Sequence, residues 1–339
     1  MSISCLVRYY MPAKLFSGLL MVFAAASSSG RITCAKSQMT GLQYDFYSQL
    51  CPNAEAIALQ TLQSSLFLDI TAPAALLRLT FHDCQVQGCD ASVLLQSTPT
   101  FQSEMKSDKN FGVRRLDFID RIKNALETAC PGTVSCADII VMAGRDSIAM
   151  SGGPNIRIQT GRRDGLFASN VRADQDLPSA LSNVDGLLNV FQPKGLSVEE
   201  SVAIIGGGHS LGIGHCVSFI NRLYPLIDNT MNTFVGNALQ VLCPNPTIYK
   251  ISNVTFFNND LTNVIFDNQY FRDLQGGRGL LTIDSEIAKD PRTQEIVRSL
   301  AANQNLFFQT FTSAFQKLTS WQVLTGTNGE IRRDCRFAN

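Results

Sequence analysis

The chain has 339 residues, 45% of them hydrophobic, which is enough for one large domain or two ordinary ones with a substantial core. Its 28 Lys and Arg residues balance its 28 Asp and Glu residues. This balance, without a basic stripe or a block of like charges, argues against a nucleic-acid-binding protein and against a charged disordered tail.

The N-terminal segment has the order of a secretory signal peptide. Arg8 and Lys14 precede an apolar run at 15–26 that ends in small residues, and this run is too short to span a bilayer comfortably. We therefore expect residues 1–30, with an approximate boundary, to be a signal peptide and residues 31–339 to be the mature domain. A buried N-terminal helix is the alternative. No other apolar run is long enough to suggest a membrane span.

Helical periodicity dominates the rest of the chain, and strand-like alternation is scarce. Pro73 suits a first helical turn, and Ser197 with Glu200 forms a capping box. The segments with helical spacing, in chain order, are 54–69, 71–83, 114–130, 135–154, 197–206 and 295–320, the last as one or two helices. The pattern predicts an all-α fold in one compact unit with two lobes.

Ten cysteines indicate an oxidising compartment. Cys5 lies in the expected signal peptide and Cys34 just after it. The other eight are Cys51, Cys84, Cys89, Cys130, Cys136, Cys216, Cys243 and Cys335. An even number predicts four disulfides and leaves their pairing open; zinc is the alternative, but the closely spaced pairs lack the CxxC spacing of a zinc site. The sequon Asn253-Val254-Thr255 would be usable for glycosylation on the same route.

The stretch RLTFHDCQVQGCDAS, residues 78–92, holds the first candidate site. On a helix, Arg78 and His82 lie one turn apart on one face, and the permanent charge of the arginine favours a neutral imidazole. A proton acceptor beside an anion stabiliser can split a polar X–O bond. The alternative is a structural histidine next to an arginine that pairs with a carboxylate.

The same stretch contains oxygen ligands that suit a calcium ion. Asp83 faces away from His82, and Gly88, Asp90 and Ser92 follow on a loop. Carboxylates, a hydroxyl and loop carbonyls together are the ligands that Ca²⁺ prefers.

A second histidine, His209, lies in the glycine-rich stretch GGGHSLGIGHC. Three preceding glycines would let a flat ligand approach the backbone, so His209 is a candidate axial iron ligand. An incidental histidine in a glycine-rich turn is the alternative. His215, six residues later, is interpreted as structural.

Together these motifs resemble the class III secretory plant peroxidases, the family of horseradish peroxidase. The resemblance extends from about Tyr44 to Cys335 and is carried by RLTFHDC, GCDASVLL, VSCADII, GRRDG, GGGHSLG, FDNQYF, GLLTIDSEI and VLTGTNGEIRRDC. It implies haem b between two helical lobes, hydrogen peroxide and phenolic donors as substrates, and a secreted, monomeric enzyme of the cell wall or extracellular space. A haem-containing wall protein with little turnover is the alternative.

The resemblance also implies residue roles. His209 would be the proximal iron ligand, His82 the acid–base residue and Arg78 the cation that stabilises the breaking O–O bond. The implied supporting residues are Phe81 beside them, Asp284 as the acceptor for His209, Glu104 and Asn110 as the pair that orients His82, and Pro178 near the donor site.

Two calcium sites and four disulfides are implied as well. The distal calcium ligands would be Asp83, Val86, Gly88, Asp90 and Ser92, and the proximal ones Ser210, Asn259, Thr262, Ile265 and Asp267. The implied pairs are Cys51–Cys130, Cys84–Cys89, Cys136–Cys335 and Cys216–Cys243.

This chain departs from the family pattern at four positions. Ser210 replaces a usual Thr and keeps the hydroxyl, whereas Asn259 replaces a usual Asp and removes a charge next to Asp260. Asn258 stands where an aromatic residue usually packs on the proximal histidine, and Gln85 replaces a common Phe.

Overall fold

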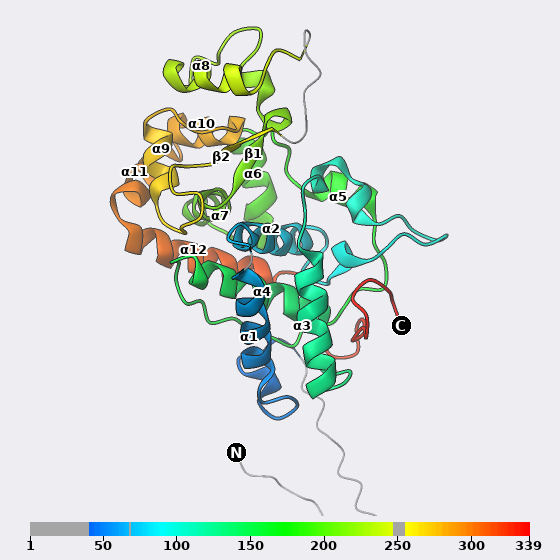
Figure 1. Cartoon of the computed structure of the whole chain (residues 1–339). Coiled ribbons are helices and arrows are strands. Elements are labelled where there is room, and N and C mark those ends of the chain that lie inside the picture. The colour runs from blue at the N-terminus through cyan, green and yellow to red at the C-terminus, as the bar shows by residue number, and fades with distance from the viewer. Residues whose placement is uncertain (1–40, 68, 247–254) are drawn as a thin grey trace, which may run out of the picture. The chain divides into compact units, whose positions relative to one another are not determined.

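The structure is a computed structural model that describes residues 41–67, 69–246 and 255–339. Within these residues it contains twelve α-helices, seven short 3-10 helices and one two-stranded sheet (Figure 1). The α-helices are α1 (Ala54–Leu66), α2 (Ala72–Gln85), α3 (Leu116–Ala129), α4 (Cys136–Met150), α5 (Asn170–Asp176), α6 (Val184–Phe191), α7 (Val198–Ser210), α8 (Thr233–Leu242), α9 (Gln269–Gln275), α10 (Thr282–Lys289), α11 (Gln294–Ala302) and α12 (Gln304–Ser320). The 3-10 helices are η1 (Phe46–Ser48), η2 (Ser92–Leu94), η3 (Glu104–Lys106), η4 (Asp108–Asn110), η5 (Gln192–Lys194), η6 (Cys216–Ser218) and η7 (Ile220–Arg222).

Local signals explain where the predicted helices begin and end. Pro73 lies in the first turn of α2, and both bonds of the Ser197–Glu200 capping box are present at the start of α7. The predicted segment 295–320 divides into α11 and α12 at Asn303, whose side chain accepts a hydrogen bond from Leu306 N. The all-α prediction is confirmed.

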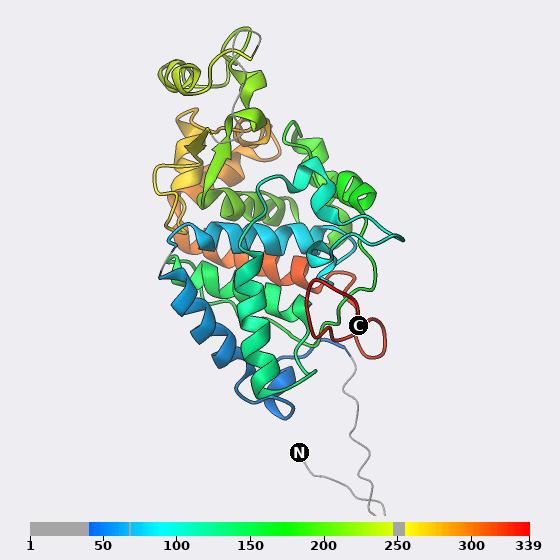
Figure 2. The ribbon, with the colours of Figure 1, turned by 45° about the vertical axis from the view of Figure 1, so that its right-hand side comes forward.

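One hydrophobic core connects the two lobes, which we define as α1–α4 (first lobe) and α6, α7 and α9–α12 (second lobe). In the first lobe α2 packs along α4, which is buried on nearly all sides. Figures 1 and 2 show that α2 also lies beside α7 and α12, and these helices are in contact. The helix that carries His82 therefore faces the helix that carries His209.

The small sheet was not predicted. Its strands, β1 (Ile213–His215) and β2 (Phe256–Asn258), are antiparallel and pair His215 with Phe256. Three residues are too few to show a period-2 pattern above chance, so the sequence carried no signal for them. The sheet fixes the segment that follows α7.

The disulfides are the four pairs that the family resemblance implied. They are Cys51–Cys130, Cys84–Cys89, Cys136–Cys335 and Cys216–Cys243. All eight described cysteines are in these bonds, so the zinc alternative is wrong for these cysteines.

The expected signal peptide, Cys5, Cys34 and Asn253 lie outside the described residues. No helix in the described part of the chain is both long and apolar enough to cross a membrane.

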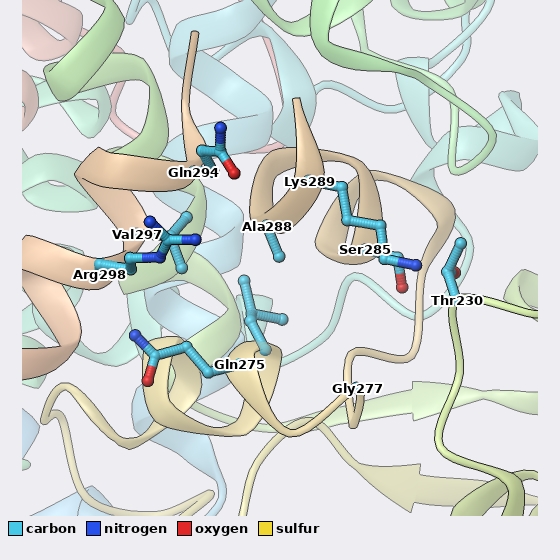
Figure 3. A pocket seen from close by; sticks show the side chains of 10 residues that line it. Thr230, Gln275, Gly277, Ser285, Ala288, Lys289, Gln294, Val297 and Arg298 are labelled. Atoms are coloured by element: carbon cyan, nitrogen blue, oxygen red, sulfur yellow. The ribbon is translucent and has the colours of Figure 1, made fainter. Parts of the chain in front are cut away.

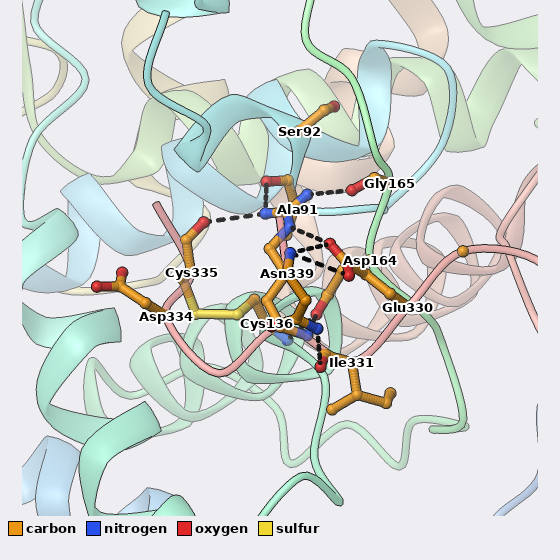
Figure 4. A network of polar contacts seen from close by, with 12 residues as sticks. Ala91, Ser92, Cys136, Asp164, Gly165, Glu330, Ile331, Asp334, Cys335 and Asn339 are labelled. Carbon is orange, nitrogen blue, oxygen red and sulfur yellow. Dashed lines mark hydrogen bonds and ion pairs between the residues drawn. A yellow bond between two sulfur atoms is a disulfide. The ribbon is translucent and has the colours of Figure 1, made fainter. Parts of the chain in front are cut away.

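Hydrogen bonds join the C-terminal segment to the loops at Ala91 and Asp164 (Figure 4), and the buried Arg332 makes several of them. The guanidinium of Arg332 donates to the main-chain oxygens of Ala91 at 2.8 Å, Gly165 at 2.7 Å and Cys335 at 3.0 Å. Its main-chain nitrogen donates to Asp164 Oδ2 at 2.9 Å. The loop after α2 is thereby held by residues from the far end of the chain.

Candidate active site

Helix α2 brings Arg78 and His82 together on one face, as the spacing predicted. Arg78 Nε donates to His82 Nε2 over 3.1 Å. A second guanidinium nitrogen, Nη2, donates to the main-chain oxygen of Lys109 at 3.3 Å. The cation is therefore held beside the imidazole from two directions.

The other ring nitrogen of His82 is oriented by Asn110. His82 Nδ1 lies 2.6 Å from Asn110 Oδ1, and Asn110 Nδ2 donates to the main-chain oxygen of Glu104 at 2.8 Å. Because the amide oxygen can only accept, Nδ1 carries the proton, and Nε2 is the unprotonated nitrogen that accepts from Arg78. Glu104 thus contributes to this chain of bonds through its backbone, not through its carboxylate.

The surroundings of His82 keep its ring neutral. Burial, and then the charge of Arg78, lower the pKa of His82 to about 3, against an opposing effect of the hydrogen bond with Asn110. Burial lowers the pKa of Arg78 to about 10, which leaves the guanidinium protonated at neutral pH. A neutral base beside a permanent cation is available over the whole physiological range.

Phe81 connects this site to the segment that carries Pro178. Its ring contacts His82 edge-on at 5.8 Å between centroids and packs on a small cluster that includes Leu177. Two polar side chains hold the same segment. Gln85 Nε2 donates to the main-chain oxygen of Asp176 at 2.7 Å, and Lys109 Nζ donates to that of Leu177 at 2.5 Å. The glutamine that replaces a usual Phe therefore has a visible role.

His209, at the end of α7, is anchored by a buried carboxylate. Its Nδ1 lies 2.9 Å from Asp284 Oδ1, and Asp284 Oδ2 accepts from Leu281 N at 2.7 Å. Burial raises the pKa of Asp284, but the charge and hydrogen bond of His209, with the bonds from Leu281 and Tyr270, outweigh it, so the pKa is lowered. The ionised carboxylate fixes Nδ1 as a donor and leaves Nε2 of His209 free for a ligand.

Tyr270 belongs to this group, and the sequence interpretation missed it. Its hydroxyl donates to Asp284 Oδ1 at 2.8 Å, and its ring contacts His209 edge-on at 5.7 Å between centroids. Phe256, one of the aromatics next to Asn258, packs instead against His215 at 6.3 Å. The signal lay in the FDNQYF motif, but the sequence does not show which ring reaches the histidine.

The prediction that all three glycines before His209 admit a flat ligand is wrong for two of them. A Cβ on Gly206 would lie 2.1 Å from the Phe271 ring, and one on Gly207 would lie 2.2 Å from the Phe311 ring. These glycines allow α7 to pack closely against α9 and α12. Only Gly208 faces open space.

His215 lies close to Arg78, which its structural interpretation did not anticipate. A Cβ on Gly112 would lie 3.1 Å from Arg78 Nη1 and 3.8 Å from His215 Nε2. The His215 ring contacts Phe111 edge-on, and its Nδ1 is buried without a partner in the structure. The Gly112 position therefore lies between the guanidinium of Arg78 and the ring of His215.

Two buried carboxyl oxygens near the predicted distal calcium residues lack hydrogen-bond partners. Asp83 Oδ2 accepts from Ala91 N at 3.1 Å, while Asp83 Oδ1 and Glu104 Oε2 are buried without hydrogen bonds. Asp90 Oδ1 accepts from Ser92 N at 2.9 Å and from its hydroxyl. This arrangement fits a cation that would supply the missing partner.

Burial and mutual repulsion act on the pKa values of these carboxyls. Burial, and then the charges of Asp90 and Glu104, raise the pKa of Asp83 well above its usual range. Burial raises the pKa of Asp90 to about 6 and that of Glu104 to about 8. No set of three or more His, Cys, Asp or Glu side chains in the described residues forms a metal site by itself, so an ion here would need carbonyl and hydroxyl ligands too.

The predicted proximal calcium residues also lie together. Ser210 Oγ is 2.9 Å from the main-chain oxygen of Asp267 and 3.4 Å from that of Ile265. Thr262 Oγ1 donates to Asp267 Oδ1 at 3.0 Å. The side chain of Asn259 does not join this group through its amide nitrogen, which donates to the main-chain oxygen of Leu211 at 3.2 Å.

A separate cavity of about 470 Å³ lies in the second lobe (Figure 3). It is lined by side chains of α9, α10 and α11, among them Gln275, Lys289 and Arg298, and it includes neither His82 nor His209. We assign it no part in the chemistry of the two histidines.

Comparisons with known proteins identify the class. The model of the peroxidase family matches residues 58–303, so the chain belongs to the peroxidase family. Its relatives are plant enzymes, and the chain is a peroxidase of the plant class III type that the motifs predicted.

Three relatives from Arabidopsis thaliana illustrate this similarity. Peroxidase 29 is 46% identical over 301 residues, which cover 87% of this chain and 88% of the relative. Peroxidase 21 is 38% identical over 299 residues, covering 88% and 91%, and Peroxidase 12 is 41% identical over 302 residues, covering 88% and 83%. The alternative of a wall protein with little turnover is not favoured.

Proposed function

We propose that this peroxidase binds haem b between His82 and His209, reduces hydrogen peroxide to water and oxidises phenolic donors in one-electron steps. The proposal rests on an arrangement that the two histidines have in common. Each has Nδ1 fixed by a protein acceptor, Asn110 for His82 and Asp284 for His209. On facing helices, Nε2 of His82 is an unprotonated base that accepts from Arg78, and Nε2 of His209 is left for a ligand. One ring can ligate a metal while the other moves a proton.

When bound, haem supplies the iron and the macrocycle that exchange electrons with peroxide and donor. His209 Nε2 would bind the haem iron, and Asp284 would make that imidazole a stronger electron donor through Nδ1. The neutral Nε2 of His82 accepts a proton from one peroxide oxygen and delivers it to the oxygen that departs as water. Arg78 stabilises the negative charge that develops on that departing oxygen. Two phenols then each give up one electron and one proton, and these two electrons and two protons convert the second peroxide oxygen to water.

One experiment tests this function directly. The protein is refolded with haem and calcium and mixed with hydrogen peroxide and a phenol. We expect a haem spectrum and peroxide-dependent oxidation of the phenol. A normal haem spectrum without any peroxide-dependent oxidation would reject the proposed reaction.

Calcium at the distal site should stabilise the protein more as the pH rises. Without the ion, the pKa values of Asp90 (about 6) and Glu104 (about 8) lie above their usual range. Between the usual and the raised values, rising pH ionises these groups in the unfolded chain but not in the folded one, so the calcium-free protein loses stability. We expect a larger calcium-induced shift in Tm at about pH 8 than at about pH 5. Thermal unfolding with calcium or with EGTA measures it, and a shift that shrinks as the pH rises contradicts this assignment.

Lys109 should influence binding of the phenolic donor, because its side chain bonds to the segment that contains Pro178. We expect Lys109→Met to raise the KM for a phenol about 3-fold or more, with the rate of reaction with peroxide within about 2-fold of wild type. The reason is that the variant loses the bond to the Leu177 carbonyl but keeps its own backbone contact with Arg78. Steady-state and rapid-mixing kinetics separate the two steps. The exposed Lys106, changed to Met, is the matched control, and an equal effect there would refute a specific role for Lys109.

We also propose export through a signal peptide at residues 1–30, an extracellular or wall location, and a monomeric enzyme. Four disulfides in the described residues support an oxidising compartment. N-terminal sequencing of the mature protein from culture medium tests the cleavage. Recovery of the chain with residues 1–30 intact would disprove it.

A further inference from the structure

We infer that the side-chain carboxylate that completes the proximal calcium site is supplied by Asp260 and that Asn259, at the family position, is not a ligand. This inference rests on the proposed calcium content, and it concerns which residue of this chain holds the ion. Asn259 and Asp260 are neighbours in sequence, so the question is which side chain joins the oxygen group formed by Ser210, Thr262 and Asp267.

That group consists of oxygens only. Ser210 Oγ lies 2.9 Å from Asp267 O, and Thr262 Oγ1 lies 3.0 Å from Asp267 Oδ1. The main-chain oxygen of Ile265 is 3.4 Å from Ser210 Oγ. Hydroxyl, carbonyl and carboxylate oxygens at such spacing are typical of a calcium shell, but Asp267 alone supplies only one negative charge.

Asn259 bonds to the backbone of the segment just before β1. Its side-chain nitrogen donates to Leu211 O at 3.2 Å, and its main-chain nitrogen donates to Gly212 O at 3.1 Å. Its side-chain oxygen faces the same segment, since a Cβ on Gly214 would lie 3.5 Å from it. The amide thus bonds to the backbone of 211–214, and being neutral it cannot balance the charge of Ca²⁺.

In contrast to Asn259, Asp260 is buried and has a carboxylate oxygen without a hydrogen-bond partner. Its side chain is 5% exposed, and Oδ1 accepts from Thr262 N at 2.8 Å, which ties it to the oxygen group. Its Oδ2 is buried without a hydrogen-bond partner. A buried carboxylate oxygen without a partner is costly unless a cation lies next to it.

Asp273, the other carboxylate nearby, needs no metal. Its Oδ2 accepts from Leu261 N at 3.0 Å, and its Oδ1 accepts from Gln269 Nε2 at 2.9 Å and from Arg278 Nε at 2.9 Å. Both oxygens are therefore satisfied by protein donors, and one donor is a cation. Of the two residues, only Asp260 has an oxygen left for an ion.

Counting calcium tests this assignment. Holoenzymes are passed into calcium-free buffer, and bound calcium is measured by elemental analysis and by calorimetric titration after treatment with EGTA. We expect about two ions per chain in the wild type and about one in Asp260→Asn, with the second ion bound at least about 10-fold more weakly. Asn259→Ala and the matched charge-removing control Asp273→Asn should keep two.

Each alternative outcome has a definite meaning. Two ions retained in Asp260→Asn, a loss in Asn259→Ala, an equal loss in Asp273→Asn, or a single ion in the wild type would each overturn the inference. If Asp260→Asn does not fold, a count of one ion in the wild type, or in Asn259→Ala, still overturns the inference. Haem content and phenol oxidation measured on the same wild-type preparation show separately whether the proposed function holds.

Discussion

Replacing His82 with alanine should leave haem bound and slow the reaction with hydrogen peroxide by about 10²–10⁴-fold. The expected loss is large because His82 is the neutral base in direct contact with Arg78, at 3.1 Å. Arg78 donates to His82 Nε2 and stays protonated near neutral pH, so it cannot act as the base. Rapid mixing with peroxide, followed by the haem absorbance, measures the rate.

The pH dependence of the wild type is the internal control for this prediction. The pKa of His82 is lowered to about 3, so the base form is present at all higher pH values. The rate with peroxide should therefore be flat from about pH 8 to about pH 5 and decline only as the pH approaches that pKa. A rate in His82→Ala close to that of the wild type would refute the role given to this histidine.

Replacing Asp284 with asparagine should lower haem affinity or the rate with peroxide by about 10–100-fold. The substitution removes the charge that accepts from His209 Nδ1 at 2.9 Å and leaves that imidazole a weaker donor to iron. The reduction potential of the iron should rise, because the oxidised state loses stabilisation. Potentiometric titration and the iron–histidine stretching frequency measure this change.

Tyr270→Phe is the matched comparison, because it should move the potential in the other direction. It keeps the ring beside His209 but removes the hydroxyl that donates to Asp284 Oδ1 at 2.8 Å. With one donor fewer, the carboxylate attracts the His209 proton more strongly, and the potential should fall. A shift in the same direction in both variants would show that Asp284 does not act through His209.

The sequence was informative where function depends on local spacing. Arg78 and His82 share a face because they are four residues apart on a helix, and Pro73 marks where that helix begins. The capping box at Ser197 and Glu200 likewise located the helix that ends at His209. Such features need only the helical repeat, which sequence displays directly.

Residues that meet across the fold could be assigned only through the resemblance. Asn110 is 28 residues from His82, and Asp284 is 75 residues from His209. Neither periodicity nor spacing connects such positions. The glycines before His209 show the opposite error, since a plausible local argument overlooked that Phe271 and Phe311 come from other helices to fill the space. Packing partners of a glycine are invisible until the helices are assembled.

The attachment of Arg332 has a consequence for biosynthesis. The loop at Ala91 is held by a residue 241 positions later, and Cys136 is bonded to a cysteine 199 positions later. An emerging chain therefore lacks the bonds that hold the loop at Ala91 until Arg332 has been synthesised. A ribosome-bound chain that stops before Arg332 cannot build the finished loop, so calcium loading, if the proposed distal site is correct, is expected to be a late event of maturation.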